Sequence, residues 1–292
     1  MNIIEEKKLI SFSKQKNKYL SSPPFPNIYF ENFFNQKFLE EVLKEFPDLN
    51  KKTETVKFDD INQLKNASIG EDLLGIKTKR LIHYLHSEPF LRFLTDLTGI
   101  ENLLPDPSLS GGGYHEIKPG GYLKIHADFN KHPKYGLDRR LNLLIYLNKS
   151  WDDSFGGDFE LWDKKMKNCV KKIPPNFNNV ALFSTTSDSY HGHPNPLKCP
   201  KGRSRKSIAL YYYTNGRPEK EKIRFLENHS TIFRAGKNEK NKNKIKKYLI
   251  SKKKKERTKR IINKFIFSVK LILPPIIIIL IKKIKNNAKT VH

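Results

Sequence analysis

The stretch Gly120-Gly121-Tyr122-Leu123-Lys124-Ile125-His126-Ala127-Asp128 decides how the rest of the chain is interpreted. Two glycines precede a run that is typical of a β-strand and that ends in a His-x-Asp pair. Side chains two positions apart lie on the same side of a strand, so His126 and Asp128 can reach one metal ion. Two imidazoles and one carboxylate are the facial ligand set of ferrous centres with open coordination positions. The pair therefore predicts a metal site that needs one more histidine.

Two candidates for that histidine, His191 and His193, occur in the segment Ser187-Asp188-Ser189-Tyr190-His191-Gly192-His193. Either of them must come from a strand remote from His126, so the fold has to bring two distant segments together. The residues alone leave both candidates open.

A basic residue follows near the start of a later apolar strand, and Arg205 and Arg203 are both candidates. A guanidinium at this place can bind the carboxylate of an anionic co-substrate through two parallel hydrogen bonds. Strand position favours Arg205, because Ser207, Ala209 and Tyr211 follow on the same face.

Short β-rich runs separated by turn clusters begin near Gly111. The predicted strands are Tyr122–Ile125, Leu141–Leu147, Asp158–Trp162, Val180–Phe183 and Ser207–Tyr213. Several short strands with regular turn signals indicate a sandwich or barrel of the jelly-roll type. We therefore predict an α+β fold in which residues 111–217 form a double-stranded β-helix, or jelly roll.

Residues 1–110 are predicted to be an N-terminal helical flank that packs on the outside of this sheet. Aromatic and aliphatic residues from Phe30 to Phe46 recur at mostly helical spacing and end at Pro47. A second helix is predicted from Ser87-Glu88-Pro89 to the stop signal Gly99.

Taken in order, these segments resemble the prolyl 4-hydroxylase-like branch of the iron(II)/2-oxoglutarate dioxygenases. The resemblance covers about residues 111–217 and at least four ordered motifs. It implies that His126 and Asp128 are catalytic iron ligands, and that Tyr146, before a Leu-Asn pair, contacts the distal carboxylate of 2-oxoglutarate. Arg205 would be the basic anchor of the same carboxylate.

The family pattern also bears on the distal ligand. It favours His191, because an aromatic residue precedes it and Pro196 follows five positions later. The 14 positions from His191 to Arg205 make a longer interval than is usual in the family, so His193 and Arg203 stay as alternatives.

The resemblance implies an enzyme that couples oxidative decarboxylation of 2-oxoglutarate to hydroxylation of an unactivated C–H bond. The expected cofactors are Fe(2+) and 2-oxoglutarate, and ascorbate is included among the candidates. The expected partners are 2-oxoglutarate, O2 and an unidentified substrate, either a prolyl residue or a small metabolite, because a fold does not fix a substrate.

The charge of the chain is concentrated at its end. The formal net charge is +26, and residues 235–292 hold 19 Lys and Arg against two acidic residues. We expect residues 218–292 to be a basic tail, partly helical or disordered, with a Lys-rich run at 237–260 and an apolar segment at 265–281. The apolar segment is a candidate for a helix packed on the protein, an element lying on an anionic membrane, or a tail anchor.

Two other classes of function compete with the enzyme. A non-catalytic jelly-roll module that binds a metal would lack a keto-acid anchor, which Arg205 and Tyr146 supply. A protein that binds nucleic acid through its basic end is disfavoured, because the run at 237–260 offers only Tyr248 for base stacking.

Further signals are weaker. His115 and His132 flank the motif and are expected to be structural or supporting residues. Two cysteines, Cys169 and Cys199, are too few for a disulfide framework, and residues 1–8 lack the apolar stretch of a signal peptide. These features predict a cytoplasmic protein, with the tail as a candidate for peripheral membrane binding.

Overall fold

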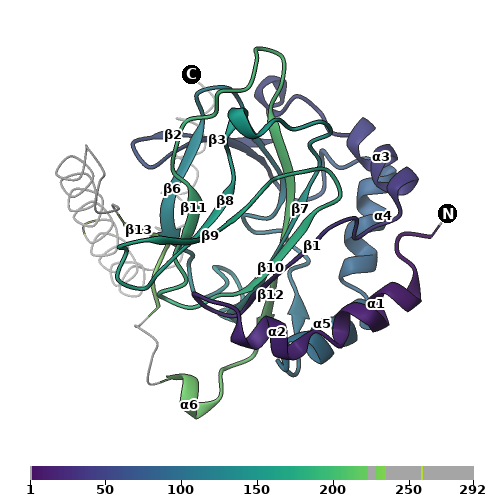
Figure 1. The fold of residues 1–292 in the computed structure, drawn as a ribbon, viewed down its shortest axis with the longest axis vertical. Coiled ribbons are helices and arrows are strands. Elements are labelled where there is room, and N and C mark those ends of the chain that lie inside the picture. The colour runs from purple at the N-terminus through teal and green to yellow at the C-terminus, as the bar shows by residue number, and fades with distance from the viewer. Residues whose placement is uncertain (1, 223–227, 235–257, 259–292) are drawn as a thin grey trace, which may run out of the picture. The chain divides into compact units, whose positions relative to one another are not determined.

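The structure, a computed structural model, describes residues 2–222, 228–234 and 258, in which helices flank a curved sheet (Figure 1). The helices are α1 (Glu6–Ser13), α2 (Lys16–Ser21), α3 (Gln36–Lys44), α4 (Ile76–Leu85), α5 (Glu88–Thr98) and α6 (Glu219–Lys222), with 3-10 turns at Leu49–Lys51 and Asp153–Phe155. The strands are β1 (Asn27–Phe30), β2 (Thr55–Asp60), β3 (Gln63–Ser68), β4 (Leu104–Pro105), β5 (Gly113–Ile117), β6 (Tyr122–Ala127), β7 (Asp138–Tyr146), β8 (Phe159–Trp162), β9 (Cys169–Ile173), β10 (Val180–Ser184), β11 (His191–His193), β12 (Arg205–Thr214) and β13 (Ile232–Phe233).

The strands join in one sheet that folds over on itself. Their order is β1-β10-β7-β12-β5-β3-β6-β11-β8-β9, while β13 pairs with β6, β2 with β3 and β4 with β12. Phe183 of β10 packs against Phe159 of β8 and His191 of β11, so the two walls face each other. The predicted jelly roll is confirmed.

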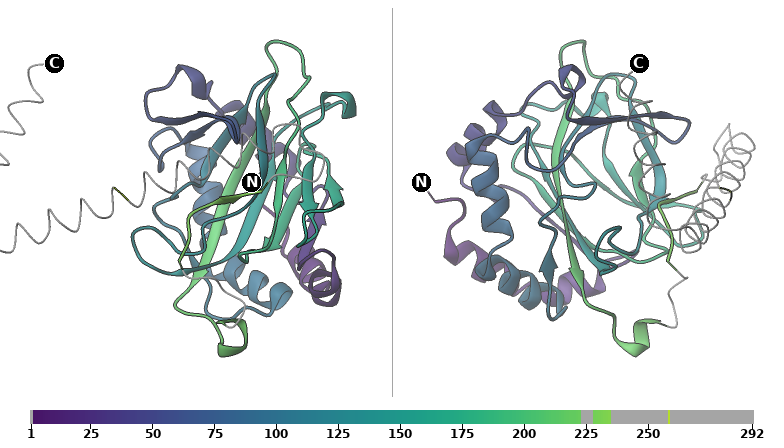
Figure 2. Two further views of the ribbon diagram at one scale, coloured as in Figure 1. Left: turned by 90° about the vertical axis from the view of Figure 1, so that its left-hand side faces the viewer. Right: turned by 180° about the vertical axis from the view of Figure 1, so that it is seen from behind.

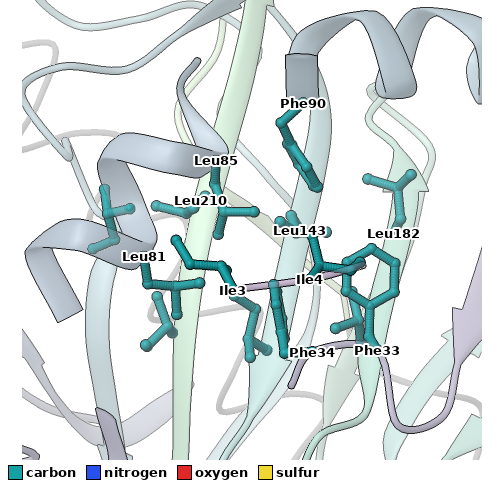
Figure 3. Packing of buried hydrophobic residues seen from close by; sticks show 14 of the residues in the cluster. Ile3, Ile4, Phe33, Phe34, Leu81, Leu85, Phe90, Leu143, Leu182 and Leu210 are labelled. Carbon is teal, nitrogen blue, oxygen red and sulfur yellow. The ribbon is translucent and has the colours of Figure 1, made fainter. Parts of the chain in front are cut away.

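The outer face of the wall formed by β7, β10 and β12 is sealed by the helices. Leu143, Leu182 and Leu210 alternate with inward-facing residues and pack against helical side chains such as Leu81 and Phe90 (Figure 3). Helices α1–α5 gather along this side of the sheet, as the view from behind also shows (Figure 2). Each fully buried Leu or Phe contributes about 1.5–3 kcal/mol to folding. With both faces buried, these strands have long apolar runs, and their inner face can carry polar chemistry.

The helix predicted from Phe30 to Phe46 is shorter than expected. Its first residues are extended, because Phe30 ends β1, and α3 begins only after the N-cap Asn35, whose side chain accepts from Phe38 N. Phe33 and Phe34 lie in the connecting loop, where the amide of Asn178 bonds to both backbone groups of Phe34. The buried aromatic residues of this loop recur at helical spacing without forming a helix, which is why the predicted helix was too long. The second predicted helix is confirmed as α5, with Gly99 left-handed at its end (φ 70°).

The helical description of residues 1–110 is incomplete, since four strands lie there. β1 extends one wall beside β10, and β3 bridges the two walls by pairing with both β5 and β6. The expected start of the tail at residue 218 also needs correction, because β13 pairs with β6 and belongs to the same sheet.

The segments predicted at 237–260 and 265–281 lie outside the described residues. Among the residues that are described, no helix is long and apolar enough to cross a membrane. A cytoplasmic location and membrane binding by the tail stay predictions.

Candidate functional site

His126 and His191 face each other on neighbouring strands. They are register partners in the antiparallel pair of β6 and β11, and their ring centroids are 4.5 Å apart. Asp128 lies one residue past the end of β6, and its carboxylate is close to both rings. The fold thus brings together two segments that are 65 positions apart in the chain.

The donor atoms of these three side chains all lie within 4.8 Å of one another. Asp128 Oδ1 is 3.5 Å from Nε2 of His126, and Oδ2 is 3.3 Å from Nε2 of His191. Each imidazole has its Nδ1 2.8 Å from a backbone carbonyl oxygen two residues earlier, Lys124 O and Ser189 O. Nδ1 therefore carries the proton, and the lone pair of Nε2 faces the common centre, the orientation that a metal ligand needs.

The carboxylate of Asp128 is held by two further side chains. Asn142 Nδ2 donates to Oδ2 at 2.7 Å, and Arg139 Nη2 lies 3.1 Å from the same oxygen. Burial would raise the pKa of Asp128, but Arg139 and the two imidazoles outweigh it and hold the pKa well below its usual range. The group is therefore an ionised carboxylate at neutral pH.

Arg139 is a site residue that sequence reasoning missed. Its guanidinium carbon lies 3.5 Å from the ring centroid of Tyr211 and 4.3 Å from that of Phe129, and its Nε donates to Asn142 Oδ1 at 2.9 Å. Simple alternation along β7 would put Arg140, not Arg139, on the face of Asn142. The register between β12 and β7 shifts at this point, as a β-bulge does, and Arg139 turns inward.

Arg205 and Tyr146 lie together at another place inside the barrel. Both are buried, at 5% and 1% exposure, and the guanidinium carbon of Arg205 is 5.0 Å from the ring centroid of Tyr146. Burial raises the pKa of Tyr146 to about 12, although nearby Arg205 opposes this. Among the described residues the phenol oxygen makes no well-formed hydrogen bond.

The backbone at Gly157 fits closely around Arg205. Arg205 Nε donates to Gly157 O at 2.8 Å. Gly157 has φ +84°, and a Cβ there would lie 2.6 Å from Leu197 Cδ2 and 3.0 Å from Arg205 Cδ. A glycine is thus required for the arginine to take this position.

The alternative residues are placed elsewhere. Arg203 donates to the backbone oxygens of Lys149 and Ser150, at 2.5 and 3.1 Å, in an exposed environment. His193 is buried but does not belong to the cluster of donor atoms, and neither of its ring nitrogens has a partner among the described residues. It remains an unpaired polar side chain inside the barrel.

The two flanking histidines have different surroundings. His132 is buried, lies 3.1 Å from Asp106 Oδ1 and stacks on Tyr135, away from the cluster. His115 faces the barrel interior, where Lys65 Nζ lies 3.5 Å from its Nδ1. His132 is thus a structural residue, whereas His115 contacts a cation of the interior.

Residues 228–234 cover the strand that carries His126. Phe233 is the register partner of His126, and their ring centroids are 5.3 Å apart. His229 Nε2 lies 2.7 Å from Ser187 Oγ, close to β11. This segment lies against the histidine cluster on one side. This contact was not predicted from the sequence, because the segment lies between charged stretches.

Comparison with known proteins agrees with this geometry. Residues 112–213 match the model of the 2OG-Fe(II) oxygenase superfamily. The chain is 28% identical over 202 residues to prolyl 3-hydroxylase OGFOD1 of Mus musculus. The matched region covers 66% of this chain and 34% of that protein. The chain therefore spans about a third of the length of the curated relative that it matches.

The fold is similar to that of a prolyl hydroxylase from Trichoplax adhaerens, solved in complex with a peptide fragment of the hypoxia inducible factor oxygen degradation domain. The TM-score is 0.52 at 20% identity, over 75% of this chain and 96% of that one.

A jelly roll with an interior His-Asp-His cluster defines a class of domain suited to hold ferrous iron. Residues 112–213 are thus similar to the 2OG-Fe(II) oxygenase superfamily, and the chain is similar to a protein named prolyl 3-hydroxylase. The family implies Fe(2+) and 2-oxoglutarate as its cofactors.

Proposed function

We propose that this chain is an iron(II)- and 2-oxoglutarate-dependent dioxygenase that hydroxylates an unactivated C–H bond. The observation that carries the proposal is the convergence of the His126, Asp128 and His191 donor atoms within 4.8 Å inside a jelly roll. We assign these three residues as the metal ligands.

The donor set fits iron(II). Two neutral imidazoles and one ionised carboxylate match a ferrous site that keeps open positions. The backbone contacts of both Nδ1 atoms and the pairing of Asp128 with Arg139 and Asn142 orient the ligands before any metal binds.

The residues around Arg205 fit 2-oxoglutarate. We assign Arg205 and Tyr146 to its distal carboxylate, because a buried guanidinium and an unpaired buried phenol both favour an anion as partner. When bound, the iron and 2-oxoglutarate supply the oxidant: O2 gives one oxygen atom to the substrate and one to succinate, with release of carbon dioxide. The protein contributes binding, orientation and exclusion of water.

For the acceptor we propose a prolyl residue or a small metabolite. The support is the similarity to a relative named prolyl 3-hydroxylase and to a fold solved with a bound peptide. We also propose ascorbate as an accessory reductant, to be included in assays.

The test is anaerobic addition of iron(II) and 2-oxoglutarate to the purified protein. We expect a weak visible charge-transfer band, followed by release of succinate when O2 and candidate acceptors are added. A protein that gives no band but binds zinc tightly would instead be a non-catalytic metal-binding module.

A further inference from the structure

Lys65 is a cationic side chain of the barrel interior that the proposed chemistry does not use. Lys65 Nζ lies 3.5 Å from Nδ1 of His115, and Nε2 of that ring lies 3.0 Å from Gly111 O. The ring therefore donates through Nε2 and accepts through Nδ1, so it takes at most one of the three ammonium hydrogens.

The strand register places Lys65 on the face that carries the proposed co-substrate residues. Ala67 of β3 is opposite His115 of β5, which is opposite Ser207 of β12, and Ser207 is opposite Tyr146 of β7. Residues directly opposite each other share a face, and Lys65 is two positions from Ala67. Lys65 and His115 thus face the same interior as Tyr146.

Two other cations that face the interior have assigned counter-charges. Arg139 pairs with Asp128 at 3.1 Å, and Arg205 is assigned to the distal carboxylate of 2-oxoglutarate. Among the described residues no carboxylate oxygen lies within 4.0 Å of Lys65 Nζ. Burial lowers the pKa of Lys65 to about 8; Asp128 opposes this, whereas Arg205 and Arg139 add to it. The half-buried ammonium lies 5.1 Å from the ring centroid of Phe58 but has no close counter-charge in the described part of the chain, and an incoming anion would supply one.

When iron and 2-oxoglutarate are bound, the other charges of the site balance one another and the positive charge of Lys65 has no counter-charge from any residue that the structure describes. Asp128 and the two carboxylates of 2-oxoglutarate, together with Asp158 acting on Arg205, offset the charges of iron, Arg139 and Arg205. The cation that remains calls for one further negative charge, carried by something other than the co-substrate.

We propose that Lys65, supported by His115, binds a carboxylate of the primary substrate, so that the acceptor is a carboxylic acid with its charged group near the hydroxylated carbon. This inference rests on the proposed function and narrows it from any C–H compound to anionic acceptors. A free amino acid meets this description, and so does a peptide with a free carboxylate next to the reacting residue.

The test compares Lys65→Met and Lys65→Arg with Lys57→Met, a control at an exposed lysine of the neighbouring strand β2. The anaerobic charge-transfer band measures 2-oxoglutarate affinity in each variant. Half-saturation for succinate release is then measured with acid and amide pairs, L-proline against L-prolinamide and N-acetyl-L-proline against its amide.

We expect the wild type and Lys57→Met to prefer the acid of at least one pair by about tenfold or more, the size of one charge-assisted hydrogen bond. Lys65→Met should lose this preference, Lys65→Arg should keep part of it, and 2-oxoglutarate affinity should stay within about twofold.

Three results would count against these assignments in different ways. If Lys65→Met weakens the 2-oxoglutarate band, the cation serves the co-substrate and the inference is wrong. If the wild type shows the band but no acid preference with any pair, including no response at all, the inference is wrong and the proposed function stands. If the wild type shows no band, the proposed function itself is overturned.

Discussion

The interior site has two ends: the metal end is the cluster of His126, Asp128 and His191, and the anion end is the region of Arg205, Tyr146 and His193. The two ends differ in how well their polar atoms are paired. At the metal end, Asp128 has Asn142 and Arg139 as partners, and both imidazoles donate to backbone oxygens. At the anion end, Tyr146 Oη and both ring nitrogens of His193 are buried without partners among the described residues.

This difference shows that the two ends are organised to different degrees before a ligand binds. Buried polar groups are nearly always hydrogen-bonded, so an unpaired one that faces a site indicates an atom that a ligand can complete. The metal end is oriented by the protein itself. At the anion end Arg205 Nε already donates to Gly157 O, but among the described residues Tyr146 Oη and the ring nitrogens of His193 lack partners.

The largest effect is expected when an imidazole of the metal end is removed. His191→Ala should abolish detectable cobalt(II) binding and succinate release, and His126→Ala and Asp128→Ala should do the same, because three protein ligands define the site. The absorption spectrum of cobalt(II) measures the first effect without turnover.

His193→Ala is the matched control for that experiment. It should keep cobalt(II) affinity within about threefold, because this ring lies outside the donor cluster. If His193→Ala loses the metal and His191→Ala keeps it, the assignment of the distal ligand is wrong.

At the anion end, Arg205→Ala should raise the 2-oxoglutarate concentration for half-saturation on the order of 100-fold, since truncating one partner of a buried charge pair costs about 2–5 kcal/mol. Cobalt(II) affinity without 2-oxoglutarate should not change. Arg203→Ala, at a half-buried arginine that binds the backbone of Lys149 and Ser150, serves as control and should behave as the wild type. Unchanged 2-oxoglutarate affinity in Arg205→Ala would remove this residue from the site.

Arg139→Gln tests whether the pairing of Asp128 supports the metal. We expect cobalt(II) affinity to fall about 10- to 100-fold, the usual cost of losing a group that orients a ligand. Arg140→Gln, which changes the neighbouring arginine that pairs with Glu221, should leave the affinity near that of the wild type. Equal losses in the two variants would mean that general destabilisation, not the pairing, is responsible.

Some residues of the site could be predicted from the sequence, because they lie at alternating positions of one strand or in motifs that occur in a fixed order. His126 and Asp128 follow from the two-residue period of β6, and the structure places Arg205 and Tyr146 together as the motifs implied. Arg139 was not predicted as a site residue, because a bulge in β7 makes Arg139 rather than Arg140 face inward. Such a register shift cannot be seen in the local sequence.

The strands in residues 1–110 were not predicted, for a related reason. β3 is held by pairing with β5 and β6, segments about fifty or sixty positions away, and its sequence Gln63-Leu64-Lys65-Asn66-Ala67-Ser68 has little strand propensity. Lys65 was therefore invisible as a site residue until the pairing was known.

The charge of Lys65 gives the proposed binding of an acidic acceptor a pH dependence. Its pKa of about 8 lies below the ordinary value for lysine, so the ammonium is present below pH 8 and is lost as the pH rises through it. The neighbouring charged groups are Asp128, Arg205 and Arg139, and His115 is the uncharged contact. We expect the acid preference of the wild type, about tenfold at pH 7, to decline toward none by about pH 9. Lys65→Arg should keep its smaller preference at both values, and a parallel decline there would assign the titration to another group.

The smallest effect, and the most direct test of the contrast, is expected for Tyr146→Phe. Loss of one neutral hydrogen bond should weaken 2-oxoglutarate binding only about 2- to 10-fold, because Arg205 still supplies the charge. Without co-substrate the same variant should unfold at an equal or higher temperature, since it removes a buried hydroxyl that has no partner. Binding and stability should thus change in opposite directions. If Tyr146→Phe destabilises the protein in the absence of 2-oxoglutarate, the phenol is already paired, and the anion end is as complete as the metal end before any ligand arrives.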